Sequence, residues 1–596
     1  MRIWTGRAGS GKTTAILREI AARCESGEGR QILLVPELNS HRMERSLAAA
    51  TDNRGARTAE VLTFSRLADR VFSEVGGLAQ QMLTPAGQLL TLQEAARRVQ
   101  GGLSVWGGLA DKPELLGEAL GLVDECKTCA VAPEALFAAA ETCRDTALAA
   151  KLSDLAQLLT AYERLCDESL PDPRDRLTHL RDRLAESHVL DGAAVYLDGF
   201  LGFTPQELAV VDAVLAAGVP LAAAVACDMA YPEIFVTGCK TVKTLERMAK
   251  RHNRKAERIE LGASRVARPA GLAAVEAQGL LPVRVPQESC EGVRLYAAAS
   301  PFDECEHAAA YIRRKVRDEG ARYRDFVVAA RDIEPYSAFL AMAMARYDVP
   351  VFLAEKPDLL SRPPMALVTG ALNAAQSYFK YEDLFGCLKT GLMHLTREES
   401  DKLENYALTW NIRGGAWERE WAEHPDGYGQ PFDDRARAQL AELNALRARL
   451  IGPFSTLRER LKGEQPASGC VRALYDFLLA VDAPRCMADR AAAHEAAGHL
   501  QLADEYRQLW EILVSAMEQF AWVCGDTPLT AERFAKLFRL VLGEYDVGTI
   551  PVSLDRVTCG NIERACGENA KYVILLGVND GLIPKAPSSA SLLSDM

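Results

Sequence analysis

The 596-residue sequence lacks any uninterrupted apolar run of the roughly 18 residues that a membrane-spanning helix needs. It lacks an apolar signal core at its start, where MRIWTGRAGSGKTT leads straight into a glycine-rich motif. It also lacks an internal period of the kind that marks repeat proteins. These absences argue against membrane-spanning, secreted and repeat-array classes, and we expect a cytoplasmic protein of roughly three to five domains.

A surplus of positive charge is missing too. The chain has 69 Lys and Arg residues against 81 Asp and Glu residues, which gives a net charge of −12. This balance argues against a uniformly basic surface for nucleic acid. A local basic channel is still compatible with it, because binding depends on where the charges lie.

Cysteine motifs are scarce, although the chain contains 15 cysteines. Their number is odd, they are dispersed, and no export signal precedes them, so we expect reduced thiols. Cys126 and Cys129 form a C-x-x-C pair, but no second pair and no pair of histidines lies near it. This context favours ordinary cysteines on a helix over a zinc site.

The most informative feature present is GRAGSGKTT at residues 6–14. Its first eight residues fit G-x-x-x-x-G-K-[ST], in which glycines let backbone N–H groups turn toward phosphate oxygens. A short strand precedes the motif, and a helix with apolar residues at helical spacing follows it, so phosphates would meet a helix N-terminus. A glycine-rich turn without a ligand is the weaker alternative. We predict that ATP binds through Gly6, Arg7, Ala8, Gly9, Ser10, Gly11, Lys12, Thr13 and Thr14.

Further apolar strands predict a parallel α/β sheet around this motif. They are expected at residues 30–37, 193–198 and 220–228, and at 61–72, where a strand turns into a helix. Asp198 ends one of them, and the carboxyl end of such a strand is where a second Mg²⁺ contact belongs, beside the Thr13 hydroxyl. We therefore predict a Mg²⁺ site made by Thr13 and Asp198.

A second set of short strands is predicted at residues 292–300, 325–332, 349–355 and 570–580. The chain therefore reads as two α/β domains, each interrupted by a long helical segment. We place the first domain at residues 1–75 and 186–285, with its insertion at 76–185. The second comprises residues 286–385 and 546–596, with its insertion at 386–545.

The order of the motifs carries a resemblance. The segment NIERACGENAKYVILLGVNDGLIP at 561–584 and DGFLGFTP at 198–205 resemble motifs of the UvrD-like superfamily 1 helicases. Within that group, ILLVPE, TFSRLA, TPAGQLL and LLGVNDGLIP follow one another as in the B subunits of AddAB helicase–nucleases. The resemblance implies two RecA-like P-loop domains with 1B-like and 2B-like helical insertions.

The chain departs from active motors of this kind at four positions. Gly199 stands where these motors carry the Glu that activates water, and Leu201 stands where they carry a γ-phosphate-sensing Gln. In the second domain, Cys566 and Asn569 replace a Lys and a ribose-contacting Glu. Since a general base contributes about 10²–10⁴ in rate, we expect a site that holds ATP–Mg²⁺ and hydrolyses it slowly or not at all.

The resemblance also implies partners and a role. In this family the AddA-type subunit pumps DNA, and the B subunit scans the passing single strand for a Chi signal while the heterodimer processes double-strand breaks in double-stranded DNA for recombinational repair. Family members continue into an exonuclease domain with a 4Fe–4S cluster. We expect this chain to be a fragment that lacks that domain, and we assign none of its cysteines to the cluster.

Candidate DNA contacts follow the strand ends. A scanning channel needs cations for phosphates and flat side chains for bases, and Arg70 lies one helical turn beyond Arg66, so that both could face one groove. The alternatives are core aromatics and solvated helix residues. The residue after the PE strand end contributes to Chi recognition in the family, which usually has Gln there. The candidates are Leu38, Phe64, Arg66, Arg70, Phe200 and Phe203.

Two arginines are candidates for an arginine finger, with a surface role as the alternative for each. Arg331 ends a predicted strand and Arg564 lies in the 561–584 segment.

Three other functions stay open. One is an active superfamily 1 helicase with a substitute base such as Glu207. The others are a P-loop kinase of a small molecule and an assembly scaffold with an empty cradle.

Overall fold

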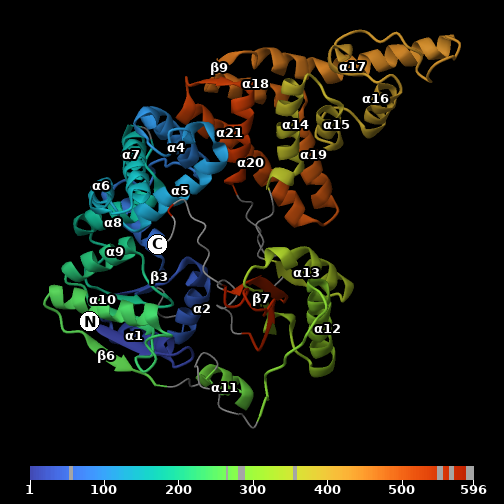
Figure 1. Cartoon of the computed structure of the whole chain (residues 1–596). Coiled ribbons are helices and arrows are strands. Elements are labelled where there is room, and N and C mark those ends of the chain that lie inside the picture. Colours follow the sequence, from blue (N-terminus) through green and yellow to red (C-terminus); the bar gives the residue numbers. More distant parts are fainter. Residues whose placement is uncertain are drawn as a thin grey trace.

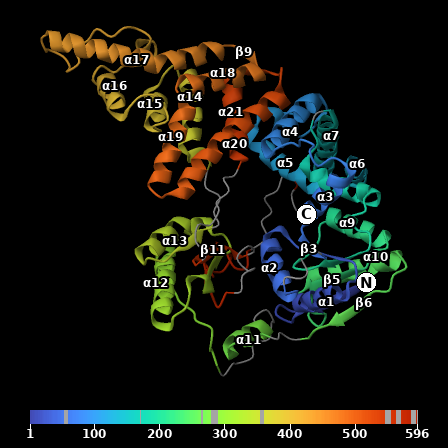
Figure 2. The same ribbon diagram turned by 180° about the vertical axis from the view of Figure 1, so that it is seen from behind.

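The computed structural model describes residues 1–52, 58–168, 170–262, 266–278, 289–353, 359–545, 555–562, 570–585 and 593. Arg564, Cys566 and Asn569 lie outside these residues. The described part contains two parallel sheets, which lie apart in both views of the ribbon, and a large body of helices (Figures 1 and 2).

The first sheet has six described strands in the order β3-β2-β4-β5-β1-β6, and every neighbouring pair is parallel. All four strands predicted with the phosphate motif are confirmed, as is the strand before it, whereas β6 was not expected. The strands are β1 (Arg2–Gly6), β2 (Arg30–Leu34), β3 (Ala59–Leu62), β4 (Ala193–Leu197), β5 (Leu221–Ala226) and β6 (Glu257–Glu260).

Helices cover both faces of this sheet, as a parallel sheet requires. Successive side chains point to opposite faces, so Leu33 packs with one set of helices and Leu34 with the other. One face carries α1 (Lys12–Ser26) and α2 (Ser40–Ala50). The other carries α3 (Phe64–Val75), α8 (Arg176–Arg183), α9 (Pro205–Ala216) and α10 (Val236–Arg251).

The second sheet has four described strands in the order β12-β7-β11-β8, again all parallel. One face packs against α12 (Pro301–Glu319) and α13 (Glu334–Arg346). Helix α11 (Ala270–Gln278) precedes this unit (Figure 1). The strands are β7 (Phe326–Ala330), β8 (Val351–Leu353), β11 (Val557–Asn561) and β12 (Tyr572–Leu576).

The strand predicted at 292–300 is wrong, because this stretch forms no strand in the structure. Tyr296 stacks on His307 of α12 with ring centroids 3.6 Å apart, and Arg294 lies over Tyr311 of the same helix. Leu295 is 94% exposed. The segment therefore packs along a helix, and an apolar pattern without a sheet partner does not make a strand. Conversely, no apolar pattern indicated β11, whose residues VTCGN are mostly small or polar.

The two predicted helical segments share a single hydrophobic core in the described residues. Leu89 and Tyr162 of the first segment belong to the same cluster as Phe520 and Phe538 of the second. The first segment contains α4 (Pro85–Val99), α5 (Pro113–Thr128), α6 (Pro133–Thr142) and α7 (Thr146–Glu168). The second contains α16 (Arg397–Thr409), α17 (Asp434–Arg460), α18 (Ala467–Ala480), α19 (Ala483–Ala496), α20 (Leu500–Cys524) and α21 (Ala531–Gly543), with the small sheet of β9 (Glu464–Pro466) and β10 (Pro528–Thr530). Two helices that begin before residue 386 pack in the same core, although the prediction gave residues 286–385 to the second α/β domain: α14 (Pro363–Ser377) and α15 (Tyr381–Lys389).

The helical body therefore joins segments far apart in the chain. The Thr84 hydroxyl lies 3.3 Å from the Tyr545 hydroxyl, and Arg533 donates to the Ala110 carbonyl at 3.2 Å. Both views place α4 beside α20 and α21 (Figures 1 and 2). Among the described residues, none of the helices combines the length and the apolar character needed to cross a membrane.

Candidate nucleotide site and flanking groove

The phosphate loop has the strand–loop–helix geometry that its sequence predicts. Strand β1 ends at Gly6, and α1 begins at Lys12. Gly9 and Gly11 have φ angles of 75° and 94°, a left-handed conformation that glycine adopts without the steric cost of a Cβ. The first-turn N–H groups of α1 have no acceptor within the helix, so the loop directs donors and the positive end of the dipole to one point.

Lys12 lies folded over this loop. Its ammonium donates to the carbonyls of Gly6 and Arg7, at 2.8 Å each. Burial lowers the pKa of Lys12, and the nearby Asp198 carboxylate acts in the opposite direction. The charge is therefore held at the mouth of the cradle, where an anionic phosphate would offer it a stronger partner than a carbonyl.

Asp198 follows β4 and is only 4% exposed. Its carboxylate accepts hydrogen bonds from the Thr13 hydroxyl and the Gly199 N–H. Burial is the largest effect and raises the pKa of the Asp198 carboxyl, although these bonds and the charges of Lys12 and Arg42 oppose it. The predicted Mg²⁺ ligands, Thr13 on α1 and Asp198 after β4, are thus in direct contact. Strand β5 lies between β4 and β1, the strand that leads into the loop.

The cradle fits a phosphate and a divalent cation. The Ser10 side-chain oxygen is buried and has no hydrogen-bond partner in the part of the chain that the structure describes. An orphaned hydroxyl of this kind is costly unless a ligand or water satisfies it. The hydroxyl of Thr13 and the carboxylate of Asp198 supply the hard oxygen donors that Mg²⁺ prefers. Of the other predicted loop residues, Ala8, Gly9 and Thr14 are exposed.

The position after Asp198 is built around a glycine. Gly199 has a φ angle of 83°, and a Cβ there would lie 3.0 Å from Nδ2 of Asn39 and 3.4 Å from Cδ of Pro36. Asn39 therefore occupies the space into which a side chain would project. Leu201, two residues on, is 78% exposed. Neither position presents a group that could activate water or sense a γ-phosphate.

Glu207, the alternative base, is engaged elsewhere. Its carboxylate accepts from the Thr204 N–H at 2.8 Å, and the Thr204 hydroxyl accepts from the Glu207 N–H at 3.2 Å. This reciprocal pair is a capping box at the start of α9. Burial raises the pKa of Glu207. The carboxylate caps the N-terminus of α9, and this structural role explains its position without a catalytic function.

Arg7 makes contacts that the sequence motif did not reveal. Its guanidinium donates to the Asp228 carboxylate at 2.7 Å and to the Glu276 carbonyl of α11 at 3.3 Å. It also lies over the rings of Tyr231 and Phe235, at 5.0 and 5.8 Å from their centroids. Asp228 lies just beyond the end of β5, as Asp198 does beyond β4. A second acidic residue at a strand end is the feature of the sequence from which a partner for Arg7 could have been predicted.

The candidate aromatic residues pack together as part of the core. Phe64 is 5% exposed, and its ring makes an edge contact with Phe200 at 5.6 Å. Phe200 and Phe203 lie 4.7 Å apart and are partly buried against the same core. The packing of Phe64 leaves no face open for a base. The side chain of Leu38 lies outside the described residues, although its backbone belongs to a short 3₁₀ helix (Glu37–Asn39).

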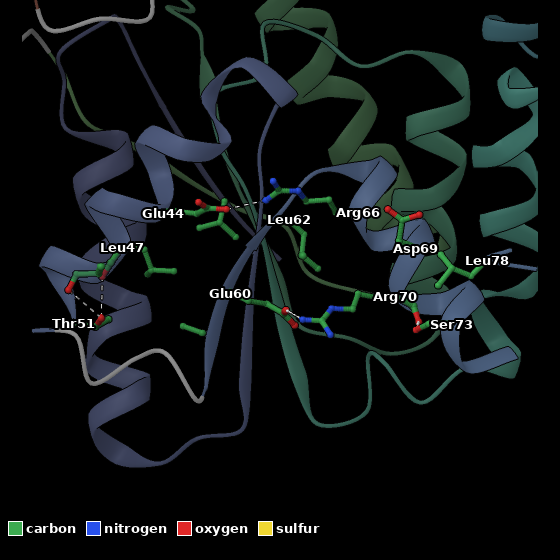
Figure 3. Close-up of a pocket in the computed structure, with 13 residues that line it drawn as sticks. Glu44, Leu47, Thr51, Glu60, Leu62, Arg66, Asp69, Arg70, Ser73 and Leu78 are labelled. Carbon is green, nitrogen blue, oxygen red and sulfur yellow. Dashed lines mark hydrogen bonds and ion pairs between the residues drawn. The ribbon is translucent and has the colours of Figure 1, made fainter. Parts of the chain in front are cut away.

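Arg66 and Arg70 do line one groove, of about 810 Å³, between α2 and α3 (Figure 3). Arg66 donates to Glu44 at 2.8 Å, and Arg70 donates to Glu60 at 3.0 Å. Asp69 lines the groove as well. The two cations are therefore balanced by carboxylates in this structure, and a phosphate would have to compete with exposed ion pairs, which are typically weak.

The remaining candidates are the two arginines proposed as arginine fingers and the C-x-x-C pair. Arg331 directly follows β7 and is exposed, and Arg564 lies outside the described residues. Cys126 is buried on α5, and burial raises its pKa to about 11, whereas Cys129 is exposed at the helix end. In the described part of the chain, no three His, Cys, Asp or Glu side chains are grouped so as to hold a metal ion.

Comparison with known proteins agrees with the motif order. Residues 3–276 match the family model described as "ADDB, N-terminal". The sequence is 32% identical to a protein of Acetivibrio thermocellus, 33% identical to one of Desulforudis audaxviator and 28% identical to one of Thermoanaerobacter sp.. All three are named as the B subunit of an ATP-dependent helicase/deoxyribonuclease. Each alignment covers 100% of this chain and 53% of the relative, so the chain spans about half the length of these relatives.

Proposed function

Because this chain belongs to the AddB family, we propose that it is the ATP-binding, helicase-like part of a helicase–nuclease B subunit that scans DNA and is not itself the motor. The proposal includes ATP–Mg²⁺ as ligand, with phosphates on residues 6–14 and the cation on Thr13 and Asp198. It includes an AddA-type partner that moves single-stranded DNA past the chain during double-strand break repair.

One observation carries this proposal: a phosphate cradle of ordinary geometry adjoins a position that has lost its carboxylate. Lys12, Thr13 and Asp198 are in place, and Gly199 is in a backbone conformation that disfavours any side chain. Binding energy for the triphosphate is therefore retained, whereas the group that would deprotonate or orient water is missing. Such a site uses nucleotide as a structural ligand that couples the loop, β4 and α1.

The chemistry of slow turnover follows from the same residues. Lys12 would neutralise phosphate charge, and Thr13 and Asp198 would hold the cation beside it. Mg²⁺ supplies charge neutralisation at those oxygens when bound. Without a base next to Asp198, the attacking water lacks the contribution of about 10²–10⁴ that such a group makes.

Nucleotide binding and hydrolysis by the 596-residue chain test this assignment. Calorimetry with ATP and Mg²⁺ should detect binding, and Lys12→Ala should weaken it by about 10–100-fold, because a charge-assisted hydrogen bond contributes about 1.5–3 kcal/mol. Lys402→Ala, at an exposed α16 lysine paired with Glu398 and Glu442, is the matched control and should bind as the parent does.

Single-turnover hydrolysis separates the scanning role from an active motor. We expect turnover to stay slow with and without single-stranded DNA. Fast DNA-stimulated hydrolysis that Lys12→Ala abolishes would establish the motor alternative instead. Phosphate release stimulated by a metabolite and not by DNA would point to the kinase, and no nucleotide binding at all would point to the scaffold.

A further inference from the structure

The exposed face of α10 carries a stripe of positive charge. Lys240, Lys243, Arg247 and Lys250 recur at intervals of three, four and three residues, and all four are exposed. At about 100° per residue they fall within an arc of roughly 80°. They also line one shallow groove of about 660 Å³, which includes Thr244 and a single acid, Glu246. We call these four cations the α10 stripe.

The opposite face of the helix fixes this orientation. Val242, Leu245, Met248 and Ala249 are buried against the first sheet. The helix cannot rotate without exposing them, and burial of each large apolar side chain contributes about 1.5–3 kcal/mol. The stripe is therefore held toward solvent. In both views, α10 itself lies on the side of the first sheet away from the second sheet (Figures 1 and 2).

In the part of the chain that the structure describes, the four cations of the α10 stripe have no acidic partners. No carboxylate among the described residues forms an ion pair with any of the four. Arg251, the next residue, pairs with Asp212, and Arg66 pairs with Glu44. Arg247 instead donates to the Lys243 carbonyl and the Thr244 hydroxyl.

The stability of the fold does not explain why four cations lie on one face of α10. Like charges three and four residues apart on a helix destabilise it by about 0.2–0.5 kcal/mol per pair. The chain as a whole has a net charge of −12, so four adjacent unpaired cations go against its composition. A polyanion that neutralises them would remove the repulsion.

The geometry points to the phosphate backbone of double-stranded DNA, bound without reading its sequence. Ten residues separate Lys240 from Lys250, which is about 15 Å along the helix. With both strands counted, a duplex has one phosphate charge for about every 1.7 Å of axis, so this length offers a phosphate to each of the four cations. The groove contains no aromatic side chain on which unstacked bases could lie, and this favours duplex over single-stranded DNA.

This contact is separate from the nucleotide site and from the groove of Arg66 and Arg70. It would hold the duplex ahead of the point where strands part, on a surface that needs no nucleotide. An acidic surface of another protein could also meet four cations, but on the proposed function this chain works on DNA, and a duplex presents phosphates along the whole length of the stripe.

Fluorescence anisotropy with a labelled duplex, measured over a range of NaCl concentrations without nucleotide, tests the proposal. The variant Lys240→Gln/Lys243→Gln/Arg247→Gln/Lys250→Gln should bind the duplex at least about 10-fold more weakly at low salt. Its slope of log K against log salt should be shallower by about 3–4, since each phosphate contact contributes about 0.9.

The matched control is Lys402→Gln/Arg472→Gln/Arg485→Gln/Arg507→Gln, which removes the same charge from exposed cations that are paired with carboxylates. It should leave the slope nearly unchanged, and circular dichroism should match for both variants. Equal slopes for the two variants would overturn the proposal, as would an equal loss of single-stranded DNA binding. Duplex binding unaffected by the stripe variant would also overturn it and leave the stripe to an acidic protein partner.

Nucleotide binding provides an independent readout. Lys12→Ala should bind the duplex as the parent does, and the stripe variant should bind ATP–Mg²⁺ as the parent does. Failure of the proposed nucleotide function would therefore leave the duplex result unchanged, and the two conclusions can fail separately.

Discussion

Replacing Gly199 by alanine tests whether the loop that carries Asp198 depends on glycine. Gly199 has a φ angle of 83°, in the left-handed region that costs a residue with a Cβ about 1–2 kcal/mol. The new methyl carbon would lie 3.0 Å from Nδ2 of Asn39, so the amide would have to move by a few tenths of an ångström. Alanine also stiffens the unfolded chain, which returns about 0.4–1 kcal/mol. We expect a net cost of about 1–2 kcal/mol.

The cost should appear mainly in nucleotide affinity. If the nucleotide-free loop shifts to relieve the strain, Asp198 leaves its place beside Thr13, and ATP–Mg²⁺ must restore it on binding. A cost of about 1–2 kcal/mol then corresponds to about 5–30-fold weaker binding, measured by calorimetry. If the loop does not shift, the same cost should lower the thermal stability of the free protein, so both quantities are measured on each variant.

Two further variants isolate the cause. Gly199→Ala/Asn39→Ala removes the closest atom and should recover the steric part of the loss, while the backbone part stays. Gly76→Ala has a similar φ of 89° but no atom within 4 Å of its Cβ, and it lies away from the site. It should affect stability without affecting ATP affinity. A Gly199→Ala protein with parental affinity and parental stability would refute the reasoning.

Three other outcomes follow from the structure. Burial raises the pKa of Asp198, so its ionised form costs stability that increases as the pH rises through that pKa. Asp198→Asn should raise the melting temperature at neutral pH while weakening ATP–Mg²⁺ binding, and the gain should shrink on acidification; a lower melting temperature at pH 7 would contradict this. Asp154, 1% exposed, accepts three backbone N–H groups, so Asp154→Ala should destabilise the helical body by about 3 kcal/mol or more in urea unfolding followed by circular dichroism. Phe64→Ala should cost about 3–5 kcal/mol because it empties a core site, whereas Arg66→Ala should change stability by less than about 1 kcal/mol, since it breaks only the exposed pair with Glu44. Equal effects of these last two substitutions on thermal unfolding would show that Phe64 is not a core residue.

Local patterns predicted much of the first domain. The glycine-rich motif, the apolar strand before it and the 3.6-residue period after it specify the turn from β1 into α1. Asp198 could be placed at the sheet edge for the same reason, because an apolar strand ends there. Its contact with Thr13 followed from the rule that carboxyl ends of parallel strands meet at one edge.

Pairing between distant segments could not be predicted in this way. The segment 292–300 has an apolar pattern typical of a strand, yet it packs along α12, whereas the small and polar residues VTCGN form β11, an inner strand of the second sheet. A strand is defined by its neighbours, and a single sequence does not show which segments become neighbours. The shared core of the two helical segments could not be predicted for the same reason, because the sequence does not show that these segments become neighbours.

Residue types and their spacing were enough to define the phosphate cradle, because glycine, lysine and threonine at those positions act through the backbone next to them. The surroundings of the cradle came from the folded arrangement alone. Folding brought Asp228 to Arg7, 221 residues away in the chain, filled the space beside Gly199 with Asn39, and turned the α10 stripe toward solvent. Side-chain partners, burial and exposed charge depend on which surfaces meet, and contacts across hundreds of residues are set by packing that no local pattern encodes.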